Sequence, residues 1–101
     1  MNNRFYNDNI EKIANHYGID SQMNILQEEC AELIQAVSKY RRGDPSTILE
    51  EVADVHIMLD QVVYLLGNAT IPRIVINESL NYVIENKIKR QLKRIEEESD
   101  D

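Results

Sequence analysis

Two clusters of carboxylate side chains have the residue types and the spacing that could bind a metal ion. Residues 28–32 read Glu-Glu-Cys-Ala-Glu, and residues 50–54 read Glu-Glu-Val-Ala-Asp. Carboxylates three or four residues apart face one another on a helix, where like charges repel by roughly a few tenths of a kcal/mol per pair. Each cluster therefore needs either water or a counter-ion beside it.

Helical phase separates the members of the two clusters. At about 100° per residue, Glu51 falls inside the apolar arc of its helix and Asp54 lies on the edge of that arc. Glu29 lies beside the apolar stripe of its own helix, Glu32 lies somewhat beyond it, and Glu28 points nearly away. Burying an ionised carboxylate without a partner is costly, whereas a magnesium ion accepts carboxylate oxygens from facing helices. A solvated acidic face explains either cluster alone, but it does not explain an inward Glu51.

The elements that would carry these clusters are four amphipathic helices. We expect them over about residues 8–17, 20–40, 45–66 and 73–95. Their apolar positions are Ile10, Ile13, Ala14 and Tyr17; Met23, Leu26, Cys30, Leu33, Ile34 and Val37; Ile48, Val52, Val55, Ile57, Met58, Leu59, Val62, Leu65 and Leu66; and Leu80, Ile84, Ile88 and Ile95. The third set covers so wide an arc that it predicts a subunit interface.

Helix-terminating and helix-initiating residues lie between these segments. Gly18 is placed to end the first helix, and Asp20 or Ser21 can cap the start of the second. The clearest boundary is Gly43-Asp44-Pro45, where we expect a C-terminal cap, an N-cap and the first residue of the third helix. The acidic residues 96–101 are expected to form a disordered tail.

Length and composition indicate one globular domain over residues 1–101, and the four expected helices make it all-α. Apolar residues make up 43% of the chain and charged residues 29%. The net charge of −7 disfavours a nucleic-acid polymer as partner, because such binding depends on phosphate neutralisation.

The single cysteine, Cys30, gives no internal disulfide. No apolar run approaches the roughly 20 residues of a membrane span, and the N-terminus lacks a signal-peptide core, so we expect a cytoplasmic protein without membrane contact.

The paired carboxylate motifs resemble a known family. Glu-Glu-x-x-Glu at 28–32, followed by Glu-x-x-Asp at 51–54, is similar to the signature of the MazG-like members of the all-α nucleotide pyrophosphohydrolases. The flanking sequences AELIQA and EEVADV strengthen the likeness, which spans residues from about 21 to 67. A weaker likeness follows at Asn86-Lys87.

The resemblance implies a four-helix bundle-like, obligately oligomeric hydrolase of the all-α NTP pyrophosphatase type. It implies magnesium as the required ion, with manganese as the alternative. Such an enzyme, a homodimer or homotetramer, cleaves an NTP or dNTP between the α and β phosphates and releases the monophosphate and pyrophosphate. By the motif, the metal ligands and catalytic residues are Glu29, Glu32, Glu51 and Asp54. Phosphoryl transfer needs mainly positioning and charge neutralisation, so the lack of a nucleophile motif or P-loop does not oppose this reading.

Basic residues of the fourth helix could bind the substrate's phosphates. Lys87, Arg90 and Arg94 recur at spacings of three and four, so they form one stripe along the edge of the apolar face. Together with Asn86 they are the predicted substrate-binding residues. A solvated basic face that pairs with nearby acids remains the alternative.

Two other functions are compatible with the sequence. Arg42-Gly43-Asp44 before a Glu-Glu-Val-Ala-Asp helix is also similar to the phosphoribosyl-ATP pyrophosphohydrolase of histidine synthesis. A non-catalytic helical module could instead use its wide apolar helix to assemble with a partner and its basic helix to dock on an acidic partner. Cys30 is predicted to be a packed thiol, and neither His16 nor His56 has a partner at metal-ligand spacing.

Overall fold

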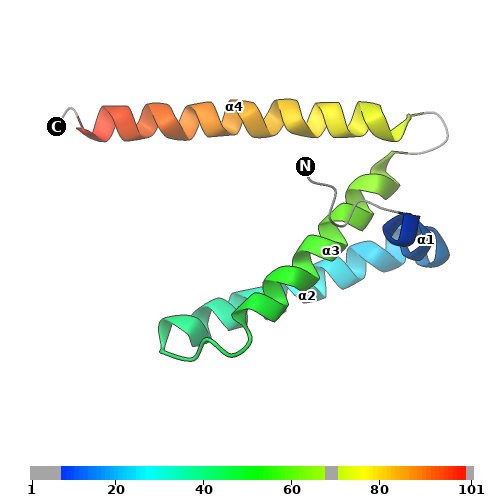
Figure 1. Ribbon diagram of the computed structural model, residues 1–101, viewed down its shortest axis with the longest axis horizontal. Helices are drawn as coiled ribbons and strands as arrows, with labels where there is room; N and C mark the ends of the chain where they lie inside the picture. Colours follow the sequence, from blue (N-terminus) through cyan, green and yellow to red (C-terminus); the bar gives the residue numbers. More distant parts are fainter. Residues whose placement is uncertain (1–7, 68–70, 100–101) are drawn as a thin grey trace. The chain divides into compact units, whose positions relative to one another are not determined.

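The computed structural model describes residues 8–67 and 71–99, and every regular element in these ranges is an α-helix. The four helices are α1 (Asp8–Tyr17), α2 (Ile19–Arg41), α3 (Ile48–Leu66) and α4 (Arg73–Ser99) (Figure 1). The predicted all-α fold with four helices is therefore confirmed for the described residues. The chain divides into two compact units, one ending at Leu66 and one beginning at Gly67. The expectation of a single domain stays a prediction.

A single glycine separates α1 from α2. The Gly18 amide donates to the Ala14 carbonyl oxygen at 2.8 Å, and its φ of +88° lies in the left-handed region that glycine tolerates. Gly18 thus ends α1 as predicted. It also occupies the N-cap position of α2, which has no side-chain cap. The expectation that Asp20 or Ser21 caps α2 is wrong, because the helix already begins at Ile19.

The connection from α2 to α3 begins with a Schellman turn. The Gly43 amide bonds the Tyr40 carbonyl at 2.9 Å and the Asp44 amide bonds the Lys39 carbonyl at 2.9 Å, with Gly43 at φ +98°. The predicted C-terminal cap at Gly43 is confirmed.

The start of α3 differs from the prediction that Asp44 is its N-cap and Pro45 its first residue. Asp44 Oδ1 instead accepts bonds from the Ser46 amide at 3.1 Å and from Ser46 Oγ at 2.7 Å. These bonds close a local turn of the kind that aspartate favours. The first helical bond beyond this turn is that from the Glu51 amide to the Thr47 carbonyl at 3.0 Å, so α3 begins at Ile48.

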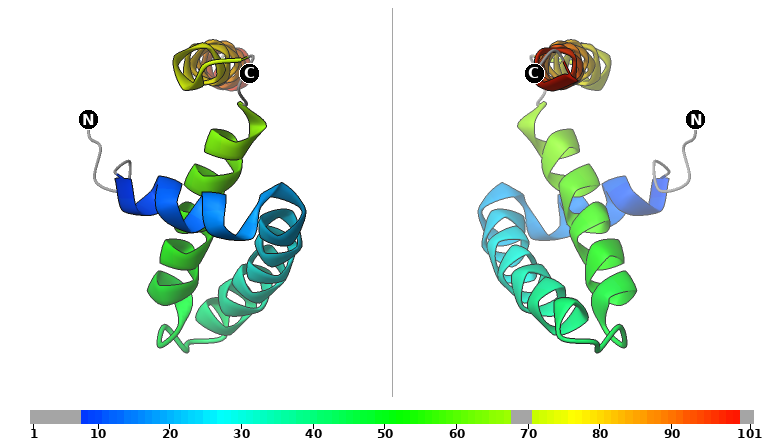
Figure 2. Two further views of the ribbon diagram at one scale, coloured as in Figure 1. Left: turned by 90° about the vertical axis from the view of Figure 1, so that its right-hand side faces the viewer. Right: turned by 90° about the vertical axis from the view of Figure 1, so that its left-hand side faces the viewer.

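The first unit is built around a hairpin of two antiparallel helices. α2 and α3 lie side by side, and α1 packs across both of them near the C-terminal end of α3 (Figures 1 and 2). We call the line of contact between α2 and α3 the seam. The buried side chains of this unit are Ile10, Ala14, Gln22, Ala36, Val55, Met58, Gln61 and Val62.

The apolar stripe that the sequence predicts on α2 is only partly buried in the seam. Ile34 keeps 68% of its surface exposed and Val37 keeps 43%, whereas Gln22 and Ala36 are buried. Leu59 and Leu66 of α3 are also exposed. Cys30 is a half-buried free thiol and does not lie deep in the core. Apolar surface of the first unit therefore remains in contact with solvent along both long helices.

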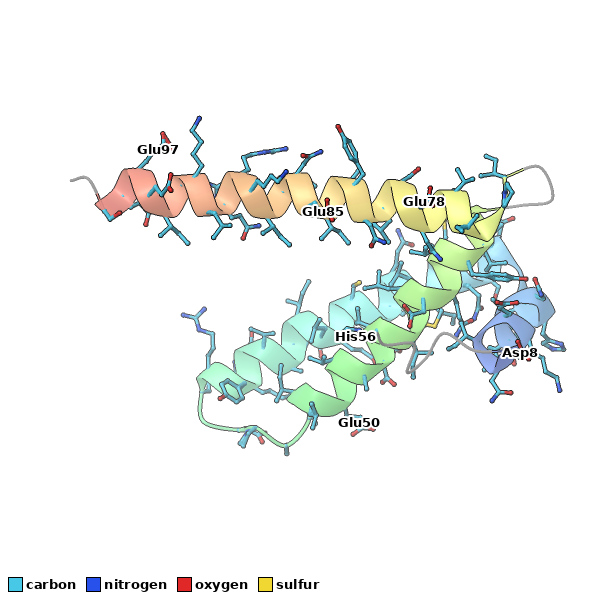
Figure 3. The ribbon with its side chains drawn as sticks, turned by 45° about the horizontal axis from the view of Figure 1, so that its top comes forward. Asp8, Glu50, His56, Glu78, Glu85 and Glu97 are labelled. Carbon is cyan, nitrogen blue, oxygen red and sulfur yellow. The ribbon has the colours of Figure 1, made fainter. Side chains whose placement is uncertain are left out.

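The second unit consists of α4, along which Glu78, Glu85 and Glu97 are distributed (Figure 3). It has no buried side chain among those described, and its predicted stripe of Leu80, Ile84, Ile88 and Ile95 is exposed. The helix continues through Ser99, whose hydroxyl donates to the carbonyl oxygens of Ile95 and Glu96. Residues 96–99 are therefore helical where a disordered tail was expected, and residues 100 and 101 lie outside the described ranges.

Within the described residues, none of the helices combines the length and the apolar content that crossing a membrane requires.

Candidate metal centre

Three of the predicted ligands meet across the seam. Glu29 lies about halfway along α2, and Glu51 and Asp54 lie in the first two turns of α3. One carboxylate oxygen from each of the three lies within 4.8 Å of the others. The antiparallel hairpin creates this arrangement, because it brings the middle of α2 opposite the beginning of α3 (Figure 1). We call Glu29, Glu51 and Asp54 the carboxylate triad.

Glu51 is the least satisfied member of the triad. Its side chain is half-buried, and its Oε2 atom is buried without a hydrogen-bond partner among the described residues. A buried oxygen of this kind costs free energy unless a donor or a cation reaches it. Partial burial raises the pKa of Glu51, and the neighbouring carboxylates of Glu32 and Asp54 raise it further.

The pKa of the Glu29 carboxyl group is also raised. Partial burial, a side-chain hydrogen bond with Asp54 and the negative charge of Asp54 together raise the pKa of Glu29 from 4.5 to about 7, and Glu32 and Glu51 add to the effect. Two carboxyl groups can share a hydrogen bond only when one of them carries a proton. A proton or a cation at the triad would relieve the repulsion among these carboxylates.

The donor set fits a hard divalent cation. Magnesium takes oxygen ligands, usually one or two carboxylates together with water and substrate phosphates. The triad supplies carboxylate oxygens from two helices, and the unpartnered Glu51 Oε2 is an atom that a cation would satisfy. The remaining coordination positions would be left to water or to a phosphate group.

The other predicted or considered acidic residues lie at the margin of the triad. Glu32 is exposed and outside the group of three, although its negative charge helps to raise the pKa of Glu51. Glu28 and Glu50 are also exposed, and Glu50 lies close to the N-terminal end of α3 (Figure 3). The structure thus brings three of the four predicted ligands together and places the fourth beside them.

The predicted substrate-binding residues belong to the second unit. Asn86, Lys87, Arg90 and Arg94 all lie on α4, and all four side chains are exposed. Their spacing places the three basic residues on one side of the helix. A role in binding phosphate stays a prediction.

Two buried polar residues lie on the same seam and are predicted neither by the apolar stripes nor by the charged clusters. Gln22 is seven residues before Glu29, and Gln61 is seven residues after Asp54. Seven residues are nearly two helical turns, so each glutamine has the same helical phase as its carboxylate. That heptad spacing is visible in the sequence, but neutral amides belong neither to the apolar stripes nor to the charged clusters.

A hollow on α2 is separate from the triad. It has a volume of about 530 Å³, and its described lining residues are Asp20, Met23, Asn24, Leu26 and Gln27. Around the helix, Gln27 and Asp20 lie about 160° and 180° from Glu29. Four of the five lining residues thus lie about 120–180° from Glu29 around α2, and only Leu26, at about 60°, lies nearer.

Comparisons with family models, with curated proteins and with solved structures gave no match to this chain. The resemblance to the MazG-like enzymes consequently stays a prediction from the motif at residues 28–54.

Proposed function

We propose that this chain is a magnesium-dependent nucleoside triphosphate pyrophosphohydrolase of the MazG-like kind. The observation that carries the proposal is the carboxylate triad, whose oxygens lie within 4.8 Å of one another while Glu51 Oε2 is buried without a partner. The order and spacing of the motif at residues 28–32 and 51–54 support the same assignment.

The chemistry of the reaction agrees with this set of residues. Hydrolysis joins a water oxygen to the α-phosphorus of an NTP or dNTP and breaks the bond from that phosphorus to the bridging oxygen, so that pyrophosphate leaves. Bound magnesium supplies charge neutralisation on the phosphate oxygens. Glu29, Glu51 and Asp54 would hold the cation, and Glu32 would add negative charge beside Glu51.

The remaining parts of the proposal concern α4 and assembly. Asn86, Lys87, Arg90 and Arg94 would contact the phosphates, since exposed basic groups and an amide suit phosphate oxygens. Self-association is supported by the exposed apolar side chains of α2, α3 and α4, because monomeric proteins rarely leave extended apolar patches in water. We therefore propose a four-helix, homo-oligomeric enzyme.

Pyrophosphate release tests the proposal directly. The purified protein with magnesium should release pyrophosphate from at least one of the eight ordinary ribo- and deoxyribonucleoside triphosphates. Glu51→Gln should lower the rate by more than roughly 100-fold, because even residues that only support metal ligands cost 10- to 100-fold in affinity or activity when changed. Glu50→Gln is the matched control, since it removes the same charge from the exposed neighbouring position.

The same assay separates the alternatives. Release of pyrophosphate from phosphoribosyl-ATP alone would favour the histidine-synthesis enzyme. A melting temperature that magnesium does not change would favour a non-catalytic helical module, because a ligand that binds only the folded state must stabilise it. Activity that survives a chelator, or equal activity of Glu51→Gln and wild type, would contradict the metal assignment.

A further inference from the structure

A buried amide pair bridges α2 and α3 at the end of the seam away from the connecting loop. Gln22 is 4% exposed and Gln61 is 2% exposed. Gln22 Nε2 donates a hydrogen bond to Gln61 Oε1 at 2.7 Å. Burying a primary amide is unfavourable unless it is hydrogen-bonded, so this position would ordinarily hold apolar residues. The pair therefore requires an explanation beyond packing.

The bonds around the pair leave each glutamine dependent on the other. Gln22 Oε1 accepts a bond from Ser21 Oγ at 3.1 Å, and Gln61 Nε2 donates to the sulfur of Met58 at 3.8 Å. The bond to sulfur is weak, so the strong partner of Gln61 is Gln22. Sliding one helix along the other by a turn would break the bond between them and bury two unpaired amides.

The apolar contacts in the rest of the seam fix the alignment of α2 against α3 less sharply than the amide pair does. The other buried side chains of α2 and α3 are Ala36, Val55, Met58 and Val62, which are all apolar. Apolar contact is non-directional, whereas a hydrogen bond weakens steeply when its angle or distance changes. Buried polar pairs are best attested as devices that fix register, meaning which turn of one helix lies opposite which turn of the other.

The register of the amide pair is also the register of the triad. Gln22 precedes Glu29 by seven residues and Gln61 follows Asp54 by seven, and the two helices are antiparallel. The alignment that places Gln22 opposite Gln61 therefore also places Glu29 opposite Asp54. Along the helix axis the two pairs are about 10 Å apart, which is close enough for one to set the other.

We propose that Gln22 and Gln61 are positioning residues that fix the register of α2 against α3 and thereby hold Glu29 beside Glu51 and Asp54. Only one consequence of this role rests on the proposed function, namely the affinity of the triad for a divalent cation. The register itself can be measured without any metal.

The first test separates positioning from stability. Gln22→Leu should lower the melting temperature, because Gln61 loses its strong partner. The double variant Gln22→Leu/Gln61→Leu should recover most of that loss, because replacing both partners by apolar groups is nearly neutral. Titration with Mn²⁺ alone, followed by electron paramagnetic resonance, should nevertheless show the double variant binding roughly 10- to 100-fold more weakly than wild type. A purely structural role would restore stability and affinity together.

A matched control guards against a general effect of destabilisation. Val62→Ala removes buried apolar surface next to Gln61 and leaves the amide pair in place. It should lower the melting temperature while its Mn²⁺ affinity stays within about twofold of wild type. Affinity that falls in step with stability in Val62→Ala would overturn the positioning role.

The second test measures register without metal. Nitroxide labels on Ser38→Cys and Leu49→Cys, with Cys30→Ala, report the α2–α3 distance from exposed positions. The distance distribution should be narrow with both glutamines and should broaden or shift in the double leucine variant. An unchanged distribution overturns the proposal. Absence of Mn²⁺ binding in wild type, together with a broadened distribution in the variant, would reject the proposed function and leave the positioning role standing.

Discussion

Two polar pairs cross the same helical seam, and they differ in how their polar atoms are satisfied. Gln22 and Gln61 are almost completely buried and satisfy each other with a short hydrogen bond. Glu29 and Asp54 lie seven residues further along each helix, are only half-buried, and can share a bond only if one of them keeps a proton. Neutral amides complete each other, whereas carboxylates need a third component. We propose that this difference makes the carboxylate end of the seam the end that binds a cation.

The largest expected effect comes from making the two ends of the seam alike. The double variant Glu29→Gln/Asp54→Asn replaces both carboxyl groups by amides, which pair without a proton or a cation. It should lose the stabilisation that magnesium gives wild type, about 2.7 kcal/mol at a concentration of 100 times Kd.

Thermal unfolding with and without magnesium measures this loss. Without magnesium, the variant should have a higher melting temperature than wild type at pH 7.5, because its two amides pair without taking up a proton. A gain of about 1 kcal/mol would raise the melting temperature by roughly 4–8 °C in a domain of this size. Glu28→Gln/Glu50→Gln is the matched control, since it removes two exposed carboxylates. A magnesium-dependent shift that persists in Glu29→Gln/Asp54→Asn would show that the cation binds elsewhere.

An intermediate effect is expected from pH alone. The folded state holds a proton on Glu29 more tightly than the unfolded chain, with a pKa of about 7 against 4.5. Its contribution therefore favours folding below pH 4.5 and is lost as pH rises through 7. The raised pKa of Glu51 acts in the same direction.

Melting temperatures measured from pH 4.5 to 8 check this linkage. Without a divalent ion the melting temperature should fall across the range, and saturating magnesium should flatten the fall near its upper end. Glu29→Gln should show a shallower slope than wild type in the absence of metal. A slope of the opposite sign in wild type would mean that the triad is fully ionised and already stabilised by other groups.

The smallest effect is expected at the margin of the triad. Glu32→Gln removes a negative charge that helps to raise the pKa of Glu51, but it keeps a side chain that can still hydrogen-bond. Metal affinity should fall less than about tenfold, well short of the loss in Glu51→Gln. Titration with Mn²⁺ compares the two variants, and equal losses would place Glu32 among the direct ligands.

The helices were predictable from the sequence because their signals are local. The ends of α1 and α2 follow from glycines that adopt positive φ, and such residues are visible in the sequence at Gly18 and Gly43. The start of α3 was not predictable from Asp44-Pro45, because the same aspartate can cap a turn or a helix, and its bonds to Ser46 select the turn.

The site was only partly predictable, since phase gives direction but not depth. Phase ranked Glu51 as inward and Glu32 as peripheral, and the structure places both accordingly. It could not reveal that Gln22 occupies the seam while Ile34 remains exposed, because this depends on how α2 rotates against α3. Polar residues that satisfy each other across two helices are recognisable only once their partners are known.

All three members of the triad come from one helical hairpin, and this limits what the connecting loop has to do. Register set by a side-chain pair inside the seam does not have to be set by the length of residues 42–47. Doubling the length of a flexible loop costs only about 0.6 kcal/mol in closure entropy. The loop after the Schellman turn is therefore a site where an epitope tag or a fluorescent reporter can be inserted while the triad keeps its geometry.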